Sequence, residues 1–326
     1  MKKMVGLLLI VLLAISVVFS TASAAQYKVG VSFDSLVSPW WVTNLEVMRS
    51  EAEKNDIELV VMMAEGDAAK QNQQIESMIA LGVDAVICGP KDSNAIVASI
   101  RKCQEAGVPI IMDNRSVTGD ILPDVQVVSN NENMARQLLM DFADIARREG
   151  KSYKAILLIG GLSDENAVFR KKGHDDAIAA NPDVFTVLTE VPTDWDLDTC
   201  LKGLQNALQA HPEANLIIAP SDYLWPPIRS SLEQIGRWAE IGEPNHFTVI
   251  AFDGDEVGMQ YMKDGYSSGD AAQDAVLQGE LCIEWAIKLI NGETPPENII
   301  FDEGQIITRD NLEEMLPQVW SFSLLK

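Results

Sequence analysis

The sequence predicts an α/β protein made of two doubly wound parallel-sheet lobes joined by a hinge. Apolar runs of strand length alternate with longer segments of helical periodicity almost from end to end. The strand-length runs are apolar throughout, which is typical of parallel strands covered by helices on both faces. The alternation restarts near the middle of the 326-residue chain, and this length exceeds that of a typical single domain.

The first series contains five predicted strands. They are residues 28–33 (KVGVSF), 57–64, 84–90, 109–114 and 125–130. Between them lie stretches of helical periodicity, such as the one that carries Ile75, Met78 and Ile79. This strand and helix alternation predicts the first lobe.

The second series contains four predicted strands, each followed by a segment of helix length. They are residues 154–161, 185–191, 215–221 and 247–254. No Pro-, Gly- or Ser-rich tether separates the two series, so we expect short ordered crossings between the lobes. Such crossings favour hinge closure over free tumbling.

Residues 1–24 are predicted to be a cleavable export signal. They contain a basic start at Lys2 and Lys3, an apolar run, and a small-residue cleavage site that ends at Ala24. The apolar run is too short for a comfortable membrane span. We therefore expect a free, soluble, periplasmic protein that begins at about Ala25.

The composition excludes some partners. The chain has 25 Lys and Arg residues against 48 Asp and Glu residues, a net charge of −23, and loss of Lys2 and Lys3 lowers it to about −25. Nucleic acid is a poor partner because phosphate contacts require a basic stripe. The four cysteines are too few and scattered for a disulfide scaffold, although one pair could form. They are Cys88, Cys103, Cys200 and Cys282.

The sequence has no catalytic or cofactor motif in its required context. It has no GxxxxGK[ST] loop and no GxGxxG turn, and residues 265–269 (GYSSG) match the letters of a GxSxG elbow but do not directly follow a predicted strand. His174, His211 and His246 have no partner at metal-ligand spacing. We therefore predict that the protein is not an enzyme and holds neither a metal nor a cofactor.

Two adjacent tryptophans open the helix predicted after the first strand. Trp41 lies on an apolar stripe with Leu45 and Met48, so it is either a core residue or a ligand contact. Trp40 falls off that stripe, which favours a ligand contact for it. Loops at the carboxyl ends of parallel strands are where α/β proteins bind ligands.

Hydrogen-bonding groups and aromatic rings recur at the predicted strand ends. They are Asp34, Ser38, Trp40, Asp113, Asn114, Arg115, Ser129, Arg170, Trp195, Ser221, Asp222, Asp253 and Gln273. A neutral polyhydroxyl ligand needs this mixture, because each hydroxyl both donates and accepts, and its C–H faces pack on indole. The recurrence indicates one polar site.

These motifs are similar to those of periplasmic solute-binding proteins of the ribose-binding type, and the resemblance covers essentially the whole mature chain. SPWW matches an aromatic pair after Asn-Pro, with Ser38 in place of the asparagine. DNR supplies Arg115 at the arginine position and Asn114 at the aspartate position. A segment that usually reads Asn-Pro is Gly89-Pro90 here, so one side-chain contact is lost.

The second half carries the remaining motifs of the resemblance. They are Arg170 three residues before Gly173, Trp195 in TDWD, Ser221 in place of an asparagine, Asp253 after Phe252, and the hinge-adjacent Gln273. Two of them have an alternative: Arg170 could lie on a helix surface beside two lysines, and Asp253 could cap a helix. Trp195 lies between two carboxylates, which resist burial, and this favours a stacking role.

The resemblance implies capture of a monosaccharide or polyol between two closing lobes and delivery to the permease of an ABC transporter. The implied ligand-binding residues are Asp34, Ser38, Trp40, Trp41, Asn114, Arg115, Ser129, Arg170, Trp195, Ser221, Asp253 and Gln273. The main alternative is a sensing partner of a chemoreceptor or sensor kinase, since WVTN also resembles an autoinducer receptor. A repressor core and an exported enzyme are weaker alternatives.

The resemblance also implies crossings near Ser129, Gln273 and Glu303. The expected first lobe is residues 25–129 plus 274–303, and the second is residues 130–273 plus 304–326. Small residues in place of asparagines predict a ligand larger than ribose or differently hydroxylated, although the two indoles fill space. The tail after residue 316 extends past the usual end of the family.

Overall fold

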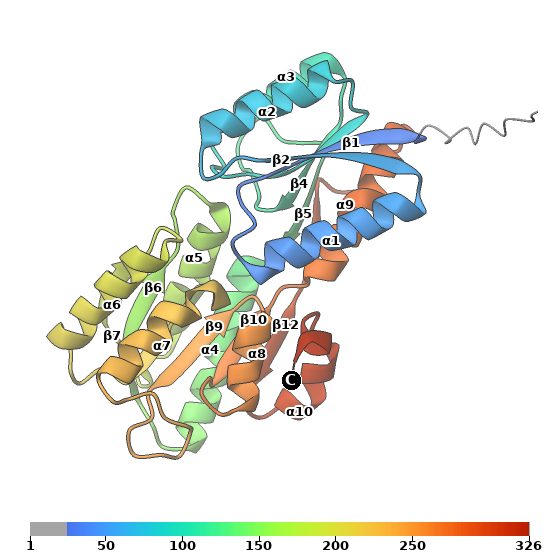
Figure 1. The fold of residues 1–326 in the computed structure, drawn as a ribbon. Coiled ribbons are helices and arrows are strands. Elements are labelled where there is room, and N and C mark those ends of the chain that lie inside the picture. Colours follow the sequence, from blue (N-terminus) through green and yellow to red (C-terminus); the bar gives the residue numbers. More distant parts are fainter. Residues whose placement is uncertain (1–24, 326) are drawn as a thin grey trace, which may run out of the picture.

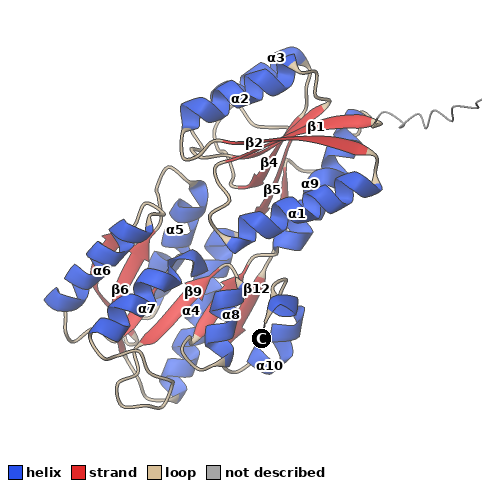
Figure 2. Cartoon of the chain, in the orientation of Figure 1, coloured by secondary structure: helices blue, strands red, loops and turns tan. Residues whose placement is uncertain are grey.

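The computed structural model describes residues 25–325 and has the predicted two-lobe α/β architecture (Figure 1). Each lobe is a six-stranded sheet with helices on both faces (Figure 2). The predicted fold class is therefore confirmed. The predicted export signal lies outside the described residues.

The first lobe contains the sheet β11-β5-β4-β3-β1-β2, in which all neighbouring strands are parallel. Helices α1 and α9 cover one face, and α2 and α3 cover the other. Its elements are β1 (Tyr27–Phe33), α1 (Pro39–Lys54), β2 (Ile57–Met63), α2 (Ala68–Ala80), β3 (Ala85–Gly89), α3 (Val97–Ala106), β4 (Ile110–Asn114), β5 (Val125–Ser129), α9 (Ala275–Ile290) and β11 (Ile299–Asp302).

The second lobe contains the sheet β12-β10-β9-β8-β6-β7, with α4 and α5 on one face and α6 and α7 on the other. Its elements are α4 (Asn131–Arg148), β6 (Tyr153–Ile159), α5 (Glu165–Ala180), β7 (Phe185–Pro192), α6 (Leu197–Ala210), β8 (Leu216–Ile218), η1 (Asp222–Leu224), α7 (Trp225–Gln234), β9 (Thr248–Phe252), α8 (Glu256–Lys263), β10 (Gly269–Ala272), β12 (Gln305–Thr308), α10 (Leu312–Met315), η2 (Leu316–Gln318) and η3 (Phe322–Leu324).

One strand departs from the all-parallel expectation. β12 runs antiparallel to β10 because the chain enters the second sheet directly from the end of β11, at the side where the two lobes meet. Three strands, β10, β11 and β12, were not predicted. Each has only four residues, which is too short for a clear periodic signal.

The chain passes between the two sheets three times, at residue 130, at residues 273–274 and at residues 303–304. The lobe boundaries that we assign follow these passages and remain our proposal. Passages this short tether the lobes closely and allow a hinge.

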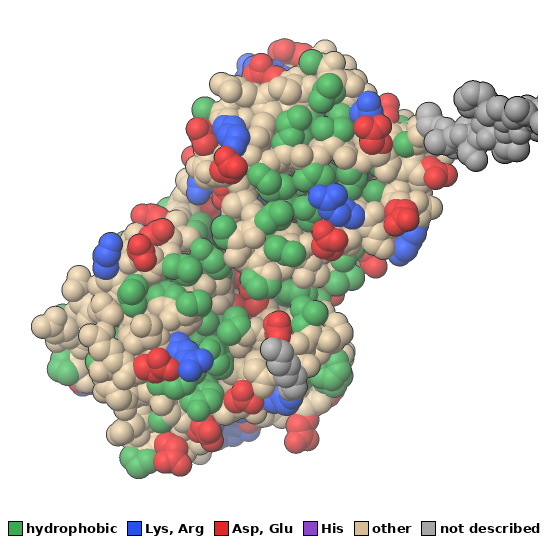
Figure 3. All heavy atoms as spheres, in the orientation of Figure 1, with side chains coloured by type: hydrophobic (Ala, Val, Ile, Leu, Met, Phe, Trp, Pro, Cys, Tyr) green, Lys and Arg blue, Asp and Glu red, His purple; other side chains and the backbone are tan. Residues whose placement is uncertain are grey.

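The surface carries mixed charge, and the thiols are buried. Acidic and basic side chains are interspersed on the face shown in Figure 3, which has no basic stripe. Within residues 25–325, no helix combines the length and apolarity needed to cross a membrane. The four cysteines are buried free thiols, so the disulfide that we considered does not form.

A buried carboxyl in the first lobe should make stability depend on pH. Asp113 lies in β4, is fully buried, and contacts the Sγ of Cys282 at 3.4 Å. Its Oδ2 has no hydrogen-bond partner. Burial raises the pKa of Asp113 from 3.8 to about 7.

We expect Asp113→Asn to stabilise the protein at pH 8 and to change little near pH 4. The folded state keeps a proton that the unfolded state loses between pH 3.8 and about 7, so stability falls as pH rises through this interval. The amide does not titrate. Urea unfolding at several pH values should therefore show the two curves diverging across this range, with the exposed Asp120→Asn as the control for charge. Parallel curves would contradict the assignment.

Candidate ligand-binding cleft

A cavity of about 440 Å³ lies between the two lobes, where strands of both sheets end. Eleven of the twelve predicted binding residues line it. They are Asp34, Ser38, Trp40, Trp41, Asn114, Arg115, Arg170, Trp195, Ser221, Asp253 and Gln273. The fold thus gathers side chains that are as far apart as 239 positions in the sequence.

The first loop brings two indoles to the cavity because Ser38 caps α1. Its hydroxyl accepts from the backbone N–H of Trp41 at 3.5 Å, and Pro39 begins the helix. Both indoles belong to the apolar core and also line the cavity. Trp40 is only 2% exposed although it falls off the apolar stripe, and its Nε1 donates to the carbonyl of Gln273 at the hinge.

Neighbouring residues at the end of β4 have different surroundings. Asn114 and Arg115 line the cavity, whereas Asp113 lies in the core behind them. The Nη1 of Arg115 lies 3.3 Å from an Asp34 carboxylate oxygen and donates to the Pro90 carbonyl at 3.0 Å. Two partners therefore fix this guanidinium before any ligand arrives.

The second lobe contributes a buried ion pair between Arg170 and Asp253, with Nη1 and Oδ1 2.9 Å apart. Arg170 is 2% exposed and lies 3.9 Å from the centre of the Phe252 ring, so the surface-helix alternative is wrong. The cap alternative is also wrong, because Asp255 is the N-cap residue of α8. Burial raises the pKa of the Asp253 carboxyl, and the Arg170 charge opposes this shift.

A chain of hydrogen bonds links the two lobes through Gln273. Its Nε2 donates to Asp253 Oδ1 at 2.8 Å, and its Oε1 accepts from Asn114 Nδ2 at 2.9 Å. The Ser221 hydroxyl donates to the other Asp253 oxygen. Gln273, at the hinge, thus hydrogen-bonds to Asn114 of the first lobe and to Asp253 of the second.

Trp195 forms part of the second lobe's wall. A Cβ on Gly160 would lie 2.2 Å from the indole Cζ2, so the ring rests directly on the glycine backbone. Its Nε1 donates to Asp164 Oδ2 at 3.1 Å. Asn114, Trp195 and Asp253 have φ values of 63°, 58° and 107°. Such strain in non-glycine residues tends to collect at functional sites.

The sequence analysis missed Asp164 and Asn166, which line the cavity and join the lobes. Asp164 Oδ2 lies 3.0 Å from the Nε of Arg115, and Asn166 Nδ2 donates to Asn114 Oδ1 at 2.8 Å. Both follow β6, and Asn166 precedes Arg170 by one helical turn. Their place after a predicted strand was the available signal.

The two lobes are closed on each other. Besides these side-chain contacts, the backbone N–H of Ser93 donates to the Ser163 carbonyl at 3.0 Å. Ser93 and Ser163 belong to different lobes, so the closed form has direct lobe-to-lobe contacts of its own.

Ser129 does not line the cavity, in contrast to the prediction. Its hydroxyl contacts Gln273 Oε1 at 3.2 Å and Asp302 Oδ2 at 3.0 Å, and it accepts from Gln278 Nε2 at 2.7 Å. All three partners lie beside the passages between lobes. Ser129 therefore supports the hinge and Gln273.

Of the three histidines, only His174 is buried. Burial lowers the pKa of His174 to about 3, so the ring is neutral. Across residues 25–325, no group of three or more His, Cys, Asp or Glu side chains is arranged to hold a metal ion. The absence of a metal and of a cofactor stays a prediction.

Comparison with known sequences decides the family. Residues 29–294 match the family described as "Periplasmic binding protein domain". The chain belongs to this family.

Individual relatives of this periplasmic binding protein span nearly the whole chain. The ribose import binding protein RbsB of Salmonella typhimurium is 27% identical and covers 90% of this chain and 94% of its own length. A xylitol-binding protein of Mycolicibacterium smegmatis is 25% identical, with 92% and 82% covered. The fold is similar to that of a Caulobacter myo-inositol binding protein, with a TM-score of 0.81, 20% identity, and 92% and 97% covered. The predicted resemblance to the ribose-binding type is confirmed.

This periplasmic binding protein departs from the ribose-type pattern at Gly89, and the structure shows what fills the space. A Cβ on Gly89 would lie 2.6 Å from Cη2 of Trp41. The indole therefore occupies the room that a larger side chain would need. Loss of that side chain does not enlarge the cavity here.

We expect Asp164→Asn to open the ligand-free protein. The substitution removes the charge that attracts Arg115 across the cleft and keeps an oxygen for the Trp195 N–H. Small-angle X-ray scattering should give a larger radius of gyration for the variant than for the unchanged protein.

The control is Asp175→Asn, which removes an exposed i,i+4 ion pair with Lys171 inside the second lobe. We expect it to leave the radius unchanged. Equal radii for all three proteins would show that the Asp164 contact does not hold the lobes together.

Proposed function

We propose that this protein captures one small polyhydroxylated molecule, a monosaccharide or polyol, between its closing lobes and delivers it to the permease of an ABC transporter. The observation that carries the proposal is the 440 Å³ cavity between the two lobes, with hydrogen-bonding groups from both and indole walls. This volume is near the lower end of the usual range for small-molecule sites, roughly 300 to 1,000 Å³. Capture needs no chemical step.

The charges in the cavity favour a neutral ligand. Three cations face three carboxylates: Arg115 contacts Asp34 and Asp164, Lys91 also lies 3.7 Å from Asp34, and Arg170 pairs with Asp253. Since these buried charges already compensate one another, a charged ligand would leave one charge unpaired, which is costly in a desolvated site.

The polar groups still have capacity for hydroxyls. An ionised carboxylate offers about four acceptor positions, and Asp253 uses three of them for Arg170, Gln273 and Ser221. A ligand hydroxyl can accept from a guanidinium while it donates to a carboxylate. This pairing of a donor and an acceptor distinguishes hydroxyls from apolar substituents.

The indoles suit the C–H faces of a sugar or cyclitol. Trp40 and Trp41 line the cavity from the first lobe, and Trp195 lines it from the second. Each aromatic contact should add roughly 0.5 to 1.5 kcal/mol beyond area burial, with aromatic pairs as the guide. A ligand that contacts both sides favours the closed form, because only differential binding shifts a conformational equilibrium.

The relatives support this ligand class and the transport role. Their names describe binding of ribose and of xylitol, and the Caulobacter structure holds myo-inositol. All three are neutral polyhydroxylated molecules. Because Trp41 fills the space at Gly89, we favour a ligand that is hydroxylated differently from ribose over one that is simply larger. We place the protein in the periplasm, as its family and predicted export signal suggest.

A thermal-shift screen with D-ribose, xylitol, myo-inositol and other neutral sugars tests the proposal. A ligand at a hundred times its Kd stabilises the folded state by about 2.7 kcal/mol, so a true ligand should raise the Tm by several degrees. We expect Trp195→Ala to weaken the best hit about tenfold in calorimetric titration, since it removes one stacking face.

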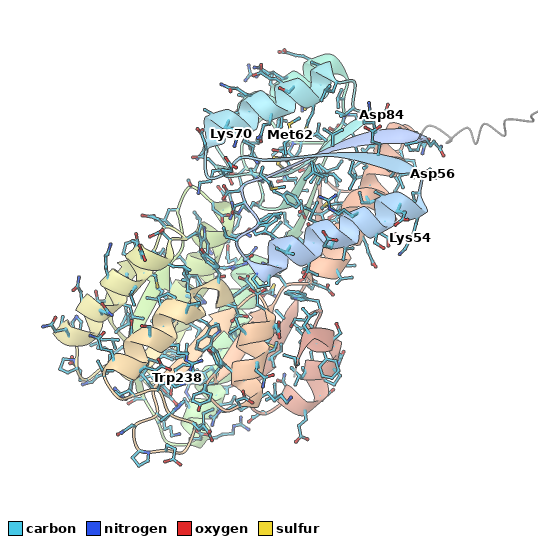
Figure 4. The ribbon with its side chains drawn as sticks, viewed as in Figure 1. Lys54, Asp56, Met62, Lys70, Asp84 and Trp238 are labelled. Carbon is cyan, nitrogen blue, oxygen red and sulfur yellow. The ribbon has the colours of Figure 1, made fainter. Side chains whose placement is uncertain are left out.

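Trp238→Ala is the matched control. Trp238 lies in the loop after α7 at the outer end of the second lobe (Figure 4), and it stacks on Tyr266 with ring centres 4.5 Å apart. Loss of this indole should leave affinity unchanged. The proposal would be wrong if no neutral sugar or polyol raised the Tm while a charged solute did.

A further inference from the structure

The C-terminal segment after β12 belongs to neither sheet and packs beside the hinge (Figure 1). Val319 is buried in a small apolar cluster with Met259 and Met262 of α8 and with Ala272 of β10. Ala272 directly precedes Gln273, and α8 begins just after the Asp253 turn. The segment therefore lies next to two groups of the cleft without lining it.

Two successive residues of this segment hold the Asp253 turn. The Nε1 of Trp320 donates to the Asp253 carbonyl at 3.0 Å, and the Ser321 hydroxyl donates to the Gly254 carbonyl at 2.5 Å. Ser321 is fully buried. These contacts are to backbone oxygens, so they act on the conformation of the turn and leave the Asp253 carboxylate for the cleft.

That turn needs outside support. Asp253 has a φ of 107° and Gly254 a φ of 70°, so two consecutive residues are in the positive-φ region. A strained conformation persists only when its surroundings fix it. The Asp253 N–H donates to the Ala271 carbonyl, and the Gly254 N–H donates to Asp270 Oδ1. The C-terminal segment supplies partners for the other two backbone groups, which completes the pairing of the turn.

Trp320 also reaches the hinge and the first lobe. Its indole packs against the apolar core of the first lobe, to which Trp40 belongs. It also borders a cavity of about 240 Å³ between two passages of the chain, where Asp274 and Glu303 lie. One side chain thus contacts the ligand-binding turn, the hinge and the opposite lobe.

We infer that residues 319–321 form a strap in which Trp320 and Ser321 are positioning residues: they hold the Asp253 turn in its binding conformation and couple it to closure of the hinge. The inference rests on the proposed function, because it treats Asp253 as a ligand contact. The strap itself touches no ligand. Without the strap, the turn relaxes and the Asp253 carboxylate moves relative to Arg170. Closure of the lobes then no longer brings this carboxylate into contact with a ligand.

The test compares the unchanged protein with the double variant Trp320→Phe, Ser321→Ala, which keeps a ring and a small side chain but removes both donors. In ligand-free protein, amide hydrogen exchange in the peptide spanning residues 252–257 should become at least about tenfold faster, because loss of two hydrogen bonds lowers the cost of local opening. Ser321→Thr keeps a hydroxyl and should exchange like the unchanged protein.

Leu312→Ala is the control for a merely structural role. Leu312 packs against the same apolar cluster, but it is not one of the residues that hydrogen-bond to the Asp253 turn. The substitution should therefore lower the Tm without changing exchange at residues 252–257. Affinity for whichever of D-ribose, xylitol or myo-inositol stabilises the unchanged protein should fall about tenfold in the double variant and stay constant in Leu312→Ala.

The outcomes separate the strap from the proposed function. Unchanged exchange at residues 252–257 in the double variant would overturn the strap, as would equal affinities in the double variant and Leu312→Ala. If none of the three probes stabilises the unchanged protein, the ligand class proposed above loses support, while the exchange measurement still decides the strap.

Discussion

A buried charge must be compensated within the protein, and the carboxylate of Asp253 imposes this constraint on the whole cleft. Arg170 compensates it, and this guanidinium makes two further hydrogen bonds: Nη1 also donates to the Pro220 carbonyl, and Nε donates to Asn131. Asn131 begins α4, immediately after the first passage between the lobes. The ion pair is therefore tied to the hinge by one further hydrogen bond, and its geometry depends on how the lobes are arranged.

If the protein captures a ligand as proposed, this arrangement makes closure and recognition one process. Gln273 connects Asp253 to Asn114 in the other lobe, and Asn166 connects Asn114 back to Asn131. The resulting ring of amides and charged groups is complete only when the lobes are closed. A ligand that adds hydrogen bonds to this ring stabilises the closed form, whereas one that touches a single lobe gains nothing from closure. The direct contacts between the lobes also stabilise the closed form, so the ligand must contribute less binding free energy to closure.

The sequence predicted what depends on local pattern. Continuous apolar runs identified the longer parallel strands, and polar residues after them identified most of the cavity wall. Asp164 was missed because its importance comes from Arg115 in the other lobe, a contact that no spacing in the chain encodes. Trp40 lines the cavity but is also a core residue, which helical periodicity does not show, because the N-terminus of α1 abuts the hinge. Ser129 ends a strand, as a cavity residue should, but its hydroxyl is hydrogen-bonded to Asp302 and Gln278.

Both lobes combine a glycine with a tryptophan at the cavity wall, and this pairing bears on what sets specificity. Gly89 makes room for Trp41, and Gly160 makes room for Trp195. In each case a missing side chain is matched by a large ring, and volume-conserving exchanges of this kind preserve packing. The size of the cavity is then a poor guide to its ligand. Discrimination between ligands must come from the hydrogen-bonding groups. A ligand that lacks a hydroxyl at the right place leaves a buried carboxylate or amide of the site unpaired, which costs far more free energy than a small change in contact area.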